Sequence, residues 1–331
     1  MPQLRCQGRA RPLGPRQEHL HQDFEELAAY LAQSTDQTKV AKLLGISWPT
    51  VGGIVRRVVD RQLHADRFEK LRRIGIDEFS YRKRHRYLTV VVDHDRRRVI
   101  WAGEGRSAKT LQSFFSLLTP TQRSSIKLVT MDMAAGYQKA VAESLPKATI
   151  VFDRFHVQRL AADALDEVRR AIVRGSRGTA DAKHVKGLRF TLLRGQWNLE
   201  PEDHLRLAEV QRTNKPLYRA YLLKEMLDEA LNCEHYHEAA KMLRGWLAWA
   251  SRSRLAPFVK AARTIRKHLD GILAYVHSRL TNGLVEGFNN KLRVVARRAF
   301  GFHSPQALIA MLFLVCGGIQ LDPPLPKAGS S

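Results

Sequence analysis

The chain has 331 residues, of which 44% are hydrophobic and 8% aromatic, an ordinary composition for a folded protein with a sizeable core. Its charge is unusual, because 55 Lys and Arg residues stand against 32 Asp and Glu residues and leave a formal net charge of +23. This excess is spread along the chain and favours a polyanionic partner. A generally basic proteome or a ribosome-associated protein is the alternative, but the apolar periodicity excludes a mere basic tail.

The cysteines and the apolar segments indicate where the protein works. Cys6, Cys233 and Cys316 are far apart and form no CxxC pair, so we expect a reducing compartment rather than a disulfide framework. The basic N-terminus lacks the apolar stretch of a secretory signal. The apolar run 307–319 is too short to span a bilayer and predicts a buried helix. We therefore expect a bacterial cytoplasmic protein, associated with the nucleoid and not with a membrane.

The N-terminal region divides into a tail and a helical block. Residues 1–22 are rich in Arg, Pro and Gln and predict a basic tail. Residues 23–62 predict a helix-turn-helix domain, in which Gly45 supplies the turn and Ser47 caps the second helix. Pro49 suits the first turn of that helix. The alternative is a helical hairpin without a role in DNA binding.

Several residues of this second helix would face DNA. Trp48, Thr50 and Gly53 lie on its exposed side and would approach a groove, whereas Arg56 and Arg57 would lie near phosphates. Together with the net charge, this pattern predicts DNA binding.

The next region changes to the period of β-strands. Strands are predicted at 72–79, 87–93 and 99–104, the last two as an antiparallel hairpin, and then a helix from about Ser107 to Leu118. A strand (IKLVT), a helix (AAGYQKAVAESL) and a strand (ATIVF) follow. This order predicts an α/β fold with a ribonuclease-H-like core, a mixed sheet with flanking helices.

The remainder of the chain predicts a long interruption of that core. Residues 71–162 would form its first part, and residues 163–276 an all-α insertion without strands. Residues 277–320 would complete the core, and residues 321–331 form a Pro-rich mobile tail.

Three acidic residues are candidates for catalysis. Asp77 and Asp132 each end an apolar run of strand character, and Glu286 lies in a helical stretch after the insertion. Such carboxylates can converge on hard divalent cations, which prefer oxygen ligands, and two ions can clamp a phosphodiester. Taken singly, each acid is better explained as a solvated or capping side chain, and it is the order and context of all three together that favour catalysis.

The helix around Glu286 has two distinct faces. Glu286 shares one face with Asn290, Arg293 and Arg297, as expected where a metal ion and DNA phosphates meet. The opposite, apolar face consists of Leu284, Phe288, Leu292 and Val295. A solvated helix face is the alternative interpretation.

Two further clusters contain titratable side chains. Asp153 and His156 follow a strand as an Asp-x-x-His unit, and we interpret them as accessory active-site residues. The alternative is a helix cap with the histidine packed beneath it. Cys233, His235 and His237 are interpreted as lying within one helix, where only the first and last share a face, so zinc binding is not expected.

Four motifs in this order resemble the ISL-three family of bacterial insertion-sequence transposases. They are GIDEFSYRKRHRYLTVVVD, VTMDMAAGYQKAVAESLPKATIVFDRFHV, KGLRFTLLRGQWNLEPED and LTNGLVEGFNNKLRVVARRAFGF, and the similarity spans residues 24–320. The resemblance implies that Asp77, Asp132 and Glu286 match the family's DDE triad. The Asp153/His156 pair resembles a motif of related transposases that carry a helical insertion.

The resemblance also implies cofactors, partners and a reaction. Mg²⁺, replaceable by Mn²⁺, would be held by the triad, and a homo-oligomer on DNA would cleave the terminal inverted repeats and transfer the strands. Such proteins usually open with a Cys-rich zinc module, whereas only Cys6 remains here, so residues 1–22 are interpreted as its remnant. The alternatives are a helix-turn-helix regulator with an inert core and a structure-specific repair nuclease.

Overall fold

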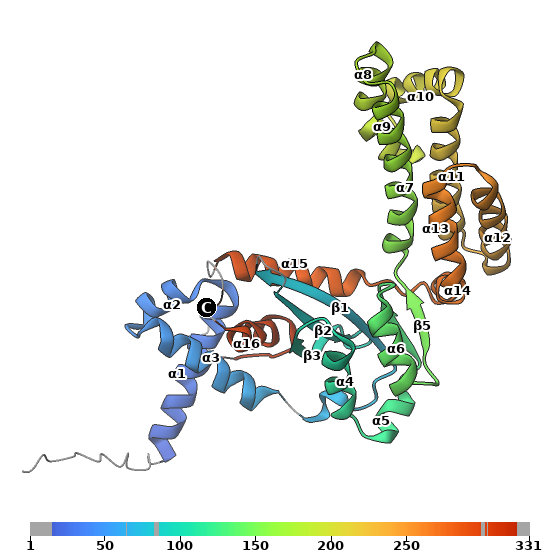
Figure 1. Cartoon of the computed structure of the whole chain (residues 1–331). Helices are drawn as coiled ribbons and strands as arrows, with labels where there is room; N and C mark the ends of the chain where they lie inside the picture. Colours follow the sequence, from blue (N-terminus) through green and yellow to red (C-terminus); the bar gives the residue numbers. More distant parts are fainter. Residues whose placement is uncertain (1–14, 64, 83–85, 299–301, 303, 323–331) are drawn as a thin grey trace, which may run out of the picture. The chain divides into compact units, whose positions relative to one another are not determined.

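The computed structural model describes residues 15–63, 65–82, 86–298, 302 and 304–322 (Figure 1). Cys6, most of the predicted N-terminal tail, and residues 323–331 of the predicted C-terminal tail lie outside these ranges. The chain forms two compact units. The first contains residues 1–70, 78–106 and 285–331, and the second contains residues 71–77 and 107–284.

A five-stranded mixed sheet lies at the centre of the fold. Its strands are β1 (Arg73–Arg82), β2 (Arg86–Asp93), β3 (Arg98–Glu104), β4 (Leu128–Met131) and β5 (Thr149–Phe152). The strand order is β3-β2-β1-β4-β5. β2 and β3 pair antiparallel, whereas β1, β4 and β5 pair parallel. The predicted α/β class and the predicted hairpin are confirmed.

The hairpin illustrates why these residues form strands. Val90, Val91 and Val92 are consecutive β-branched residues, and all three are fully buried, as expected for a strand covered on both faces. At the turn, the buried carboxylate of Asp93 accepts hydrogen bonds from the backbone N–H groups of Asp95 (2.9 Å) and Arg96 (3.3 Å). Asp93 therefore has a structural role in the turn.

The first unit begins with three helices, α1 (Pro15–Ser34), α2 (Gln37–Leu44) and α3 (Trp48–Gln62), followed by the short 3-10 helix η1 (Ala65–Phe68). Gly45 ends α2 in the left-handed region (φ 67°), and the Ser47 side chain accepts from the backbone N–H of Thr50. Pro49 occupies the first turn of α3. These local predictions are confirmed, whereas α1 starts well before the predicted residue 23.

The core of the first unit surrounds α16 (Pro305–Cys316). Seven of its twelve residues are buried, and the helix contacts α1, α3 and β3. The Gln33 side chain on α1 donates a hydrogen bond to the Leu314 carbonyl (2.9 Å). The predicted buried helix is confirmed, since a helix that is apolar all round is stable only inside a core. Within the described ranges, no helix has both the length and the apolar character needed to cross a bilayer.

In the second unit, α4 (Ala108–Ser116), α5 (Pro120–Ser125) and α6 (Ala135–Ser144) accompany β4 and β5. The rest of the unit is helical, and its elements are α7 (Arg154–Gly175), α8 (Ala180–Gly187), α9 (Arg189–Leu193), η2 (Gln196–Asn198), α10 (Pro201–Thr213), α11 (Lys215–Asn232), α12 (Tyr236–Arg252), α13 (Ala256–Lys267) and α14 (Leu269–Ser278). No strand occurs between residues 163 and 276, as predicted. In Figure 1, α7 leads away from β5, and α8 to α10 lie at its far end.

The interpretation that Cys233, His235 and His237 lie within one helix is wrong. Cys233 follows the last turn of α11, and His235 directly precedes α12. The Arg279 guanidinium donates hydrogen bonds to the carbonyls of Leu231 and Cys233, which satisfies acceptors that a continuing helix would otherwise use. The break is thus stabilised by a residue distant in sequence.

The insertion returns to the sheet through a close contact between α14 and β5. A Cβ atom added at Gly271 would lie 2.4 Å from the Phe152 ring and 3.1 Å from the Ile150 carbonyl oxygen. Gly271→Ala should therefore lower the free energy of unfolding by about 1–3 kcal/mol through overpacking. Urea denaturation measures this change.

Gly245 in α12 provides the matched control, because an added Cβ there meets nothing within 4 Å. Gly245→Ala should stabilise the protein by roughly 0.5–1 kcal/mol, since alanine restricts the unfolded chain and favours helix. Equal effects of the two substitutions would contradict a tight contact between α14 and β5.

Candidate active site

The neighbouring parallel strands β1 and β4 carry two of the predicted acids. Asp132 directly follows β4, and its Oδ1 accepts a hydrogen bond from the backbone N–H of Ala134 (3.0 Å). Asp77 lies within β1 and not at a strand end, because β1 continues to Arg82. Both aspartates are half-buried.

Asp153 and His156 form a pair at the start of α7. Asp153 is fully buried, and its Oδ2 lies 3.2 Å from His156 Nδ1. Although Asp153 occupies the N-cap position of α7, its side chain makes no capping hydrogen bond. Its Oδ1 instead accepts from the backbone N–H of Asn282 (3.4 Å). The carboxylate thus links the histidine to a segment at the end of the insertion.

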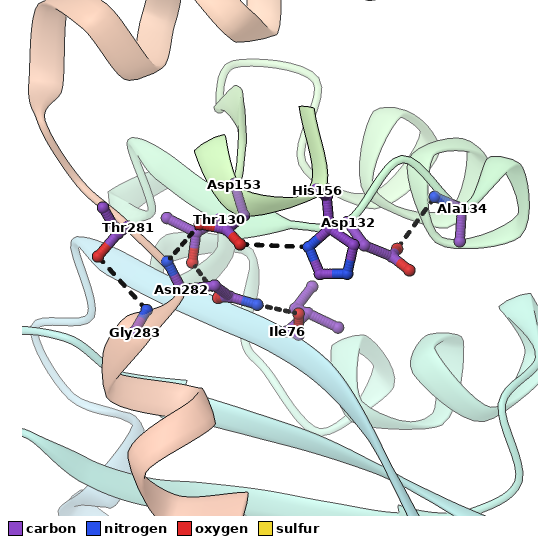
Figure 2. Close-up of polar contacts among 9 residues, drawn as sticks. All are labelled: Ile76, Thr130, Asp132, Ala134, Asp153, His156, Thr281, Asn282 and Gly283. Carbon is purple, nitrogen blue, oxygen red and sulfur yellow. Dashed lines mark hydrogen bonds and ion pairs between the residues drawn. The ribbon is translucent and has the colours of Figure 1, made fainter. Parts of the chain in front are cut away.

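The three aspartates share one electrostatic environment around His156. The hydrogen bond that the imidazole donates to Asp153 raises the pKa of His156, burial opposes this, and the negative charges of Asp153, Asp132 and Asp77 raise the pKa further. In Figure 2 the imidazole lies beside the Asp153 carboxylate, with Asp132 on its other side. The fold therefore brings residues from β1, the end of β4 and α7 together around one ring.

We expect Asp153→Asn to lower the pKa of His156, because the substitution removes the charge that acts most strongly on the imidazole. A histidine whose pKa is raised on folding contributes stability below its unfolded pKa, and this contribution is lost as the pH rises through the folded pKa. The variant should therefore lose stability relative to the wild type mainly under acidic conditions. An NMR titration of the His156 ring measures the pKa.

Asp163→Asn is the matched control for this titration. Asp163 lies on the same helix, but its side chain is 72% exposed and forms an ion pair with Arg159. Its substitution should leave the His156 titration unchanged. If Asp153→Asn also left the titration unchanged, Asp153 would not control the charge of His156.

Asn282 joins the strands at this site, although the sequence did not single it out. Its side-chain amide donates to the Ile76 carbonyl (3.3 Å), and its Oδ1 accepts from the Thr130 hydroxyl (2.7 Å). Figure 2 shows these contacts beside the Asp153–His156 pair. An Asn just before a predicted helix indicates a cap, so the sequence held no signal for a contact between strands.

Glu286 lies in the first turn of α15 (Gly283–Arg298) and belongs to the first unit. Its side chain is half-buried, whereas Asn290, Arg293 and Arg297 are exposed. Arg293 donates a hydrogen bond to Asn290 Oδ1 (2.8 Å). The apolar side is buried at Val285, Phe288, Leu292 and Val295, with Leu284 half-buried. The predicted division of this helix into two faces is confirmed.

The predicted DNA-facing residues of α3 differ in their surroundings. Thr50 and Arg56 are exposed, and Trp48 is half-buried. Arg57 donates a 2.6 Å hydrogen bond to Glu25, an α1 residue that is only 1% exposed and that also accepts from Arg61. Burial raises the pKa of Glu25, but the hydrogen bonds from Arg61 and Arg57 outweigh it and hold the pKa below its usual value. Arg57 therefore ties α3 to α1.

A divalent metal ion needs several oxygen ligands close together. Among the residues that the structure describes, no three His, Cys, Asp or Glu side chains lie close enough together to hold one. Asp77 and Asp132 nevertheless supply carboxylate oxygens, the ligands that a hard divalent cation prefers, and the charges of both act on the His156 ring.

The site combines a mixed sheet with carboxylates on adjacent parallel strands. This is the arrangement of an α/β enzyme whose active site is built from carboxylates. Residues 74–312 match the model of the ISL-three DDE family, described as transposase. The chain is 39% identical over 326 residues to the transposase for insertion sequence element IS1557 of Mycobacterium tuberculosis, covering 92% of this chain and 73% of that protein.

A second relative is the transposase for insertion sequence element IS1001 of Bordetella parapertussis. It is 32% identical over 286 residues, which cover 85% of this chain and 70% of that protein. The chain belongs to the ISL-three family of DDE transposases, and the predicted resemblance is confirmed.

Proposed function

We propose that the protein is the transposase of a bacterial insertion sequence, which binds the terminal inverted repeats and catalyses DNA cleavage and strand transfer. The observation that carries this proposal is that Asp153 pairs with His156 and that the charges of Asp132 and Asp77 act on the same imidazole, in a chain of the transposase family. The net charge of +23 supports a polyanionic substrate. The bacterial cytoplasm, where that DNA lies, is its place of action.

The strand arrangement supports a ribonuclease-H-like core. The order β3-β2-β1-β4-β5, with an antiparallel hairpin followed by parallel β4 and β5, agrees with the pattern that such a core requires. Helices α7 to α14 interrupt this core between Asp132 and Glu286. We propose that this basic insertion positions the DNA ends.

The N-terminal helices support a helix-turn-helix domain. Asp36 caps α2, Gly45 makes the turn and Ser47 caps α3, which leaves Thr50 exposed in the first turn of α3 and Arg56 exposed near the middle of that helix. A recognition helix reads base edges through residues near its N-terminus, and its arginines contact phosphates. We propose that Trp48, Thr50 and Arg56 contribute to recognition of the ends, whereas Arg57 acts mainly through Glu25.

For the catalytic step we propose that Asp77 and Asp132 hold divalent metal ions, with Mg²⁺ as the natural cofactor and Mn²⁺ as a substitute. Glu286 is the proposed third ligand, contributed by α15. When bound, such ions polarise the phosphodiester and activate the attacking oxygen. Asp153 raises the pKa of His156, so that the imidazole would offer a positive charge to the phosphate region when it is protonated, and the buried Asp153 orients its ring.

We propose that Asn290, Arg293 and Arg297 contact DNA phosphates, because they share the exposed face of α15 with Glu286. A homo-oligomer assembled on DNA would hold the two ends of one element together. Zinc has no role in this proposal.

The direct test is cleavage of a DNA that carries the element's flanking inverted repeats, with Mg²⁺ or Mn²⁺. Metal-dependent nicks at the repeat ends, followed by joining to a target DNA, are the expected result. Binding without any cleavage would indicate a regulator with an inert core. Cleavage that follows DNA shape rather than terminal sequence would indicate a repair nuclease.

A further inference from the structure

Asn282 lies in the short segment that connects α14 to α15 and is held firmly there. The residue that ends α14, Arg279, adopts a left-handed conformation (φ 54°), and its guanidinium binds the carbonyls of Leu231 and Cys233. Asn282 itself is only 1% exposed. The end of the insertion therefore enters the sheet region at a defined point.

That point is the place where the parallel pairing of β1 and β4 ends. The register runs from Arg73 opposite Leu128 to Gly75 opposite Thr130. The Asn282 amide then bridges the strands, since it donates to the Ile76 carbonyl and accepts from the Thr130 hydroxyl. Asp77 is the residue after Ile76, and Asp132 lies two residues after Thr130.

The third contact of Asn282 reaches the other acid of the site. Its backbone N–H donates to Asp153 Oδ1, while Asp153 Oδ2 pairs with His156. One buried residue thus contacts the segments that carry all three aspartates. All these groups belong to the second unit.

The chemistry of the bridge requires a side-chain amide. Its two main partners are a carbonyl, which needs a donor, and a hydroxyl, which here donates to an acceptor. A carboxylate lacks the donor, and an aliphatic side chain lacks both groups. Because the site is buried, a lost partner leaves a polar group without its hydrogen bond.

We infer that Asn282 is a positioning residue of the active site, which sets the separation and orientation of Asp77 and Asp132 for metal binding. This inference rests on the proposed function, because it assumes that these two aspartates hold the ions. Residues that orient metal ligands through hydrogen bonds typically change metal affinity or activity by about 10–100-fold when substituted.

The test uses the full chain and measures Mn²⁺ binding by electron paramagnetic resonance, together with cleavage of end DNA and thermal unfolding. Asn282→Leu removes both side-chain hydrogen bonds at similar volume. Thr130→Val removes only the hydroxyl and suits a strand. Thr281→Val is the control, because the Thr281 hydroxyl accepts a hydrogen bond from the backbone N–H of Gly283, and the contact drawn for Thr281 in Figure 2 is this local one.

We expect Asn282→Leu to weaken Mn²⁺ binding by about 10–100-fold, Thr130→Val to weaken it less, and Thr281→Val to bind as the wild type. The double variant Thr130→Val/Asn282→Leu should unfold at a higher temperature than Asn282→Leu alone. In the double variant both side chains of that hydrogen bond are apolar, so no buried hydroxyl is left without its acceptor. Its Mn²⁺ affinity should remain low, because the Ile76 contact is still missing. If Asn282 had only a structural role, the Mn²⁺ affinity of the double variant would recover together with its unfolding temperature.

Wild-type Mn²⁺ affinity and cleavage in folded Asn282→Leu would overturn the inference. If that variant does not fold, the Mn²⁺ affinity of Thr130→Val is the test. A wild-type affinity of Thr130→Val would also overturn the inference. Asp132→Asn serves as the reference in the same assays. If it is inactive while the Asn282 and Thr130 variants behave as wild type, only this inference fails. If Asp132→Asn itself binds Mn²⁺ and cleaves normally, the proposed function fails as well.

Discussion

Replacing Asp77 or Asp132 with Asn, or Glu286 with Gln, is expected to lower the rate of end cleavage by about a thousandfold or more. These substitutions preserve size but remove the charge proposed to hold the metal ions, whose stabilisation of the transition state is worth several kcal/mol. Because the three acids would act as a unit, each single variant should lose nearly as much activity as the triple variant. Gel analysis of nicked end DNA measures the rates.

DNA affinity should survive in these variants or rise slightly, because negative charge near the phosphates is removed. Asp163→Asn, which removes an exposed carboxylate from α7, should cleave as the wild type. If Glu286→Gln cleaved at close to the wild-type rate, Glu286 would not be the third ligand. Asp153, which is fully buried beside His156, would then be the next candidate.

The second large effect is expected on the exposed side of α3. Thr50→Ala combined with Arg56→Ala should weaken binding to the element's ends by roughly tenfold or more, since a base contact is worth about 1–3 kcal/mol. Binding to random DNA should decrease much less, and loss of one phosphate contact should reduce the slope of affinity against salt by about one. A competition gel shift at several salt concentrations measures both quantities.

Lys139→Ala is the matched control for the α3 variant, because it removes one positive charge from a side chain on α6 that is 76% exposed. It should not change the preference for the ends. Equal losses on end DNA and random DNA for the α3 variant would contradict sequence recognition by this helix. These point substitutions are preferable to deletion of residues 1–62, because α1 and α3 contact the apolar α16, which the deletion would expose.

Local features of the fold could be predicted because they depend on neighbours in the sequence. Gly45, Ser47 and Pro49 specify the turn between α2 and α3 through backbone freedom, capping and a fixed φ angle. The apolar periodicity of the last core helices predicted α15 with two faces and the buried α16. The limits of the helices could not be predicted in the same way. The break between α11 and α12 at Cys233 is stabilised by Arg279, which is distant in the sequence.

The candidate site was predicted only in part. The acids Asp77 and Asp132 could be found because each ends an apolar run of residues, and Asp153 and His156 because their spacing sets them one turn apart. The position of Asp77 within β1 was not predicted, since the length of a strand depends on its partner strands. Glu286 as third ligand stays a prediction.

The sequence by itself determined the elements, their order and the family, because periodicity, caps and motifs are properties of adjacent residues. Only the tertiary structure decided which distant groups meet. The parallel pairing of β1, β4 and β5 brings three aspartates to one imidazole, and the return of the insertion through α14 places Asn282 between two strands. The contacts of Asn282 depend on the packing of segments more than a hundred residues apart, and local patterns carry no information about them.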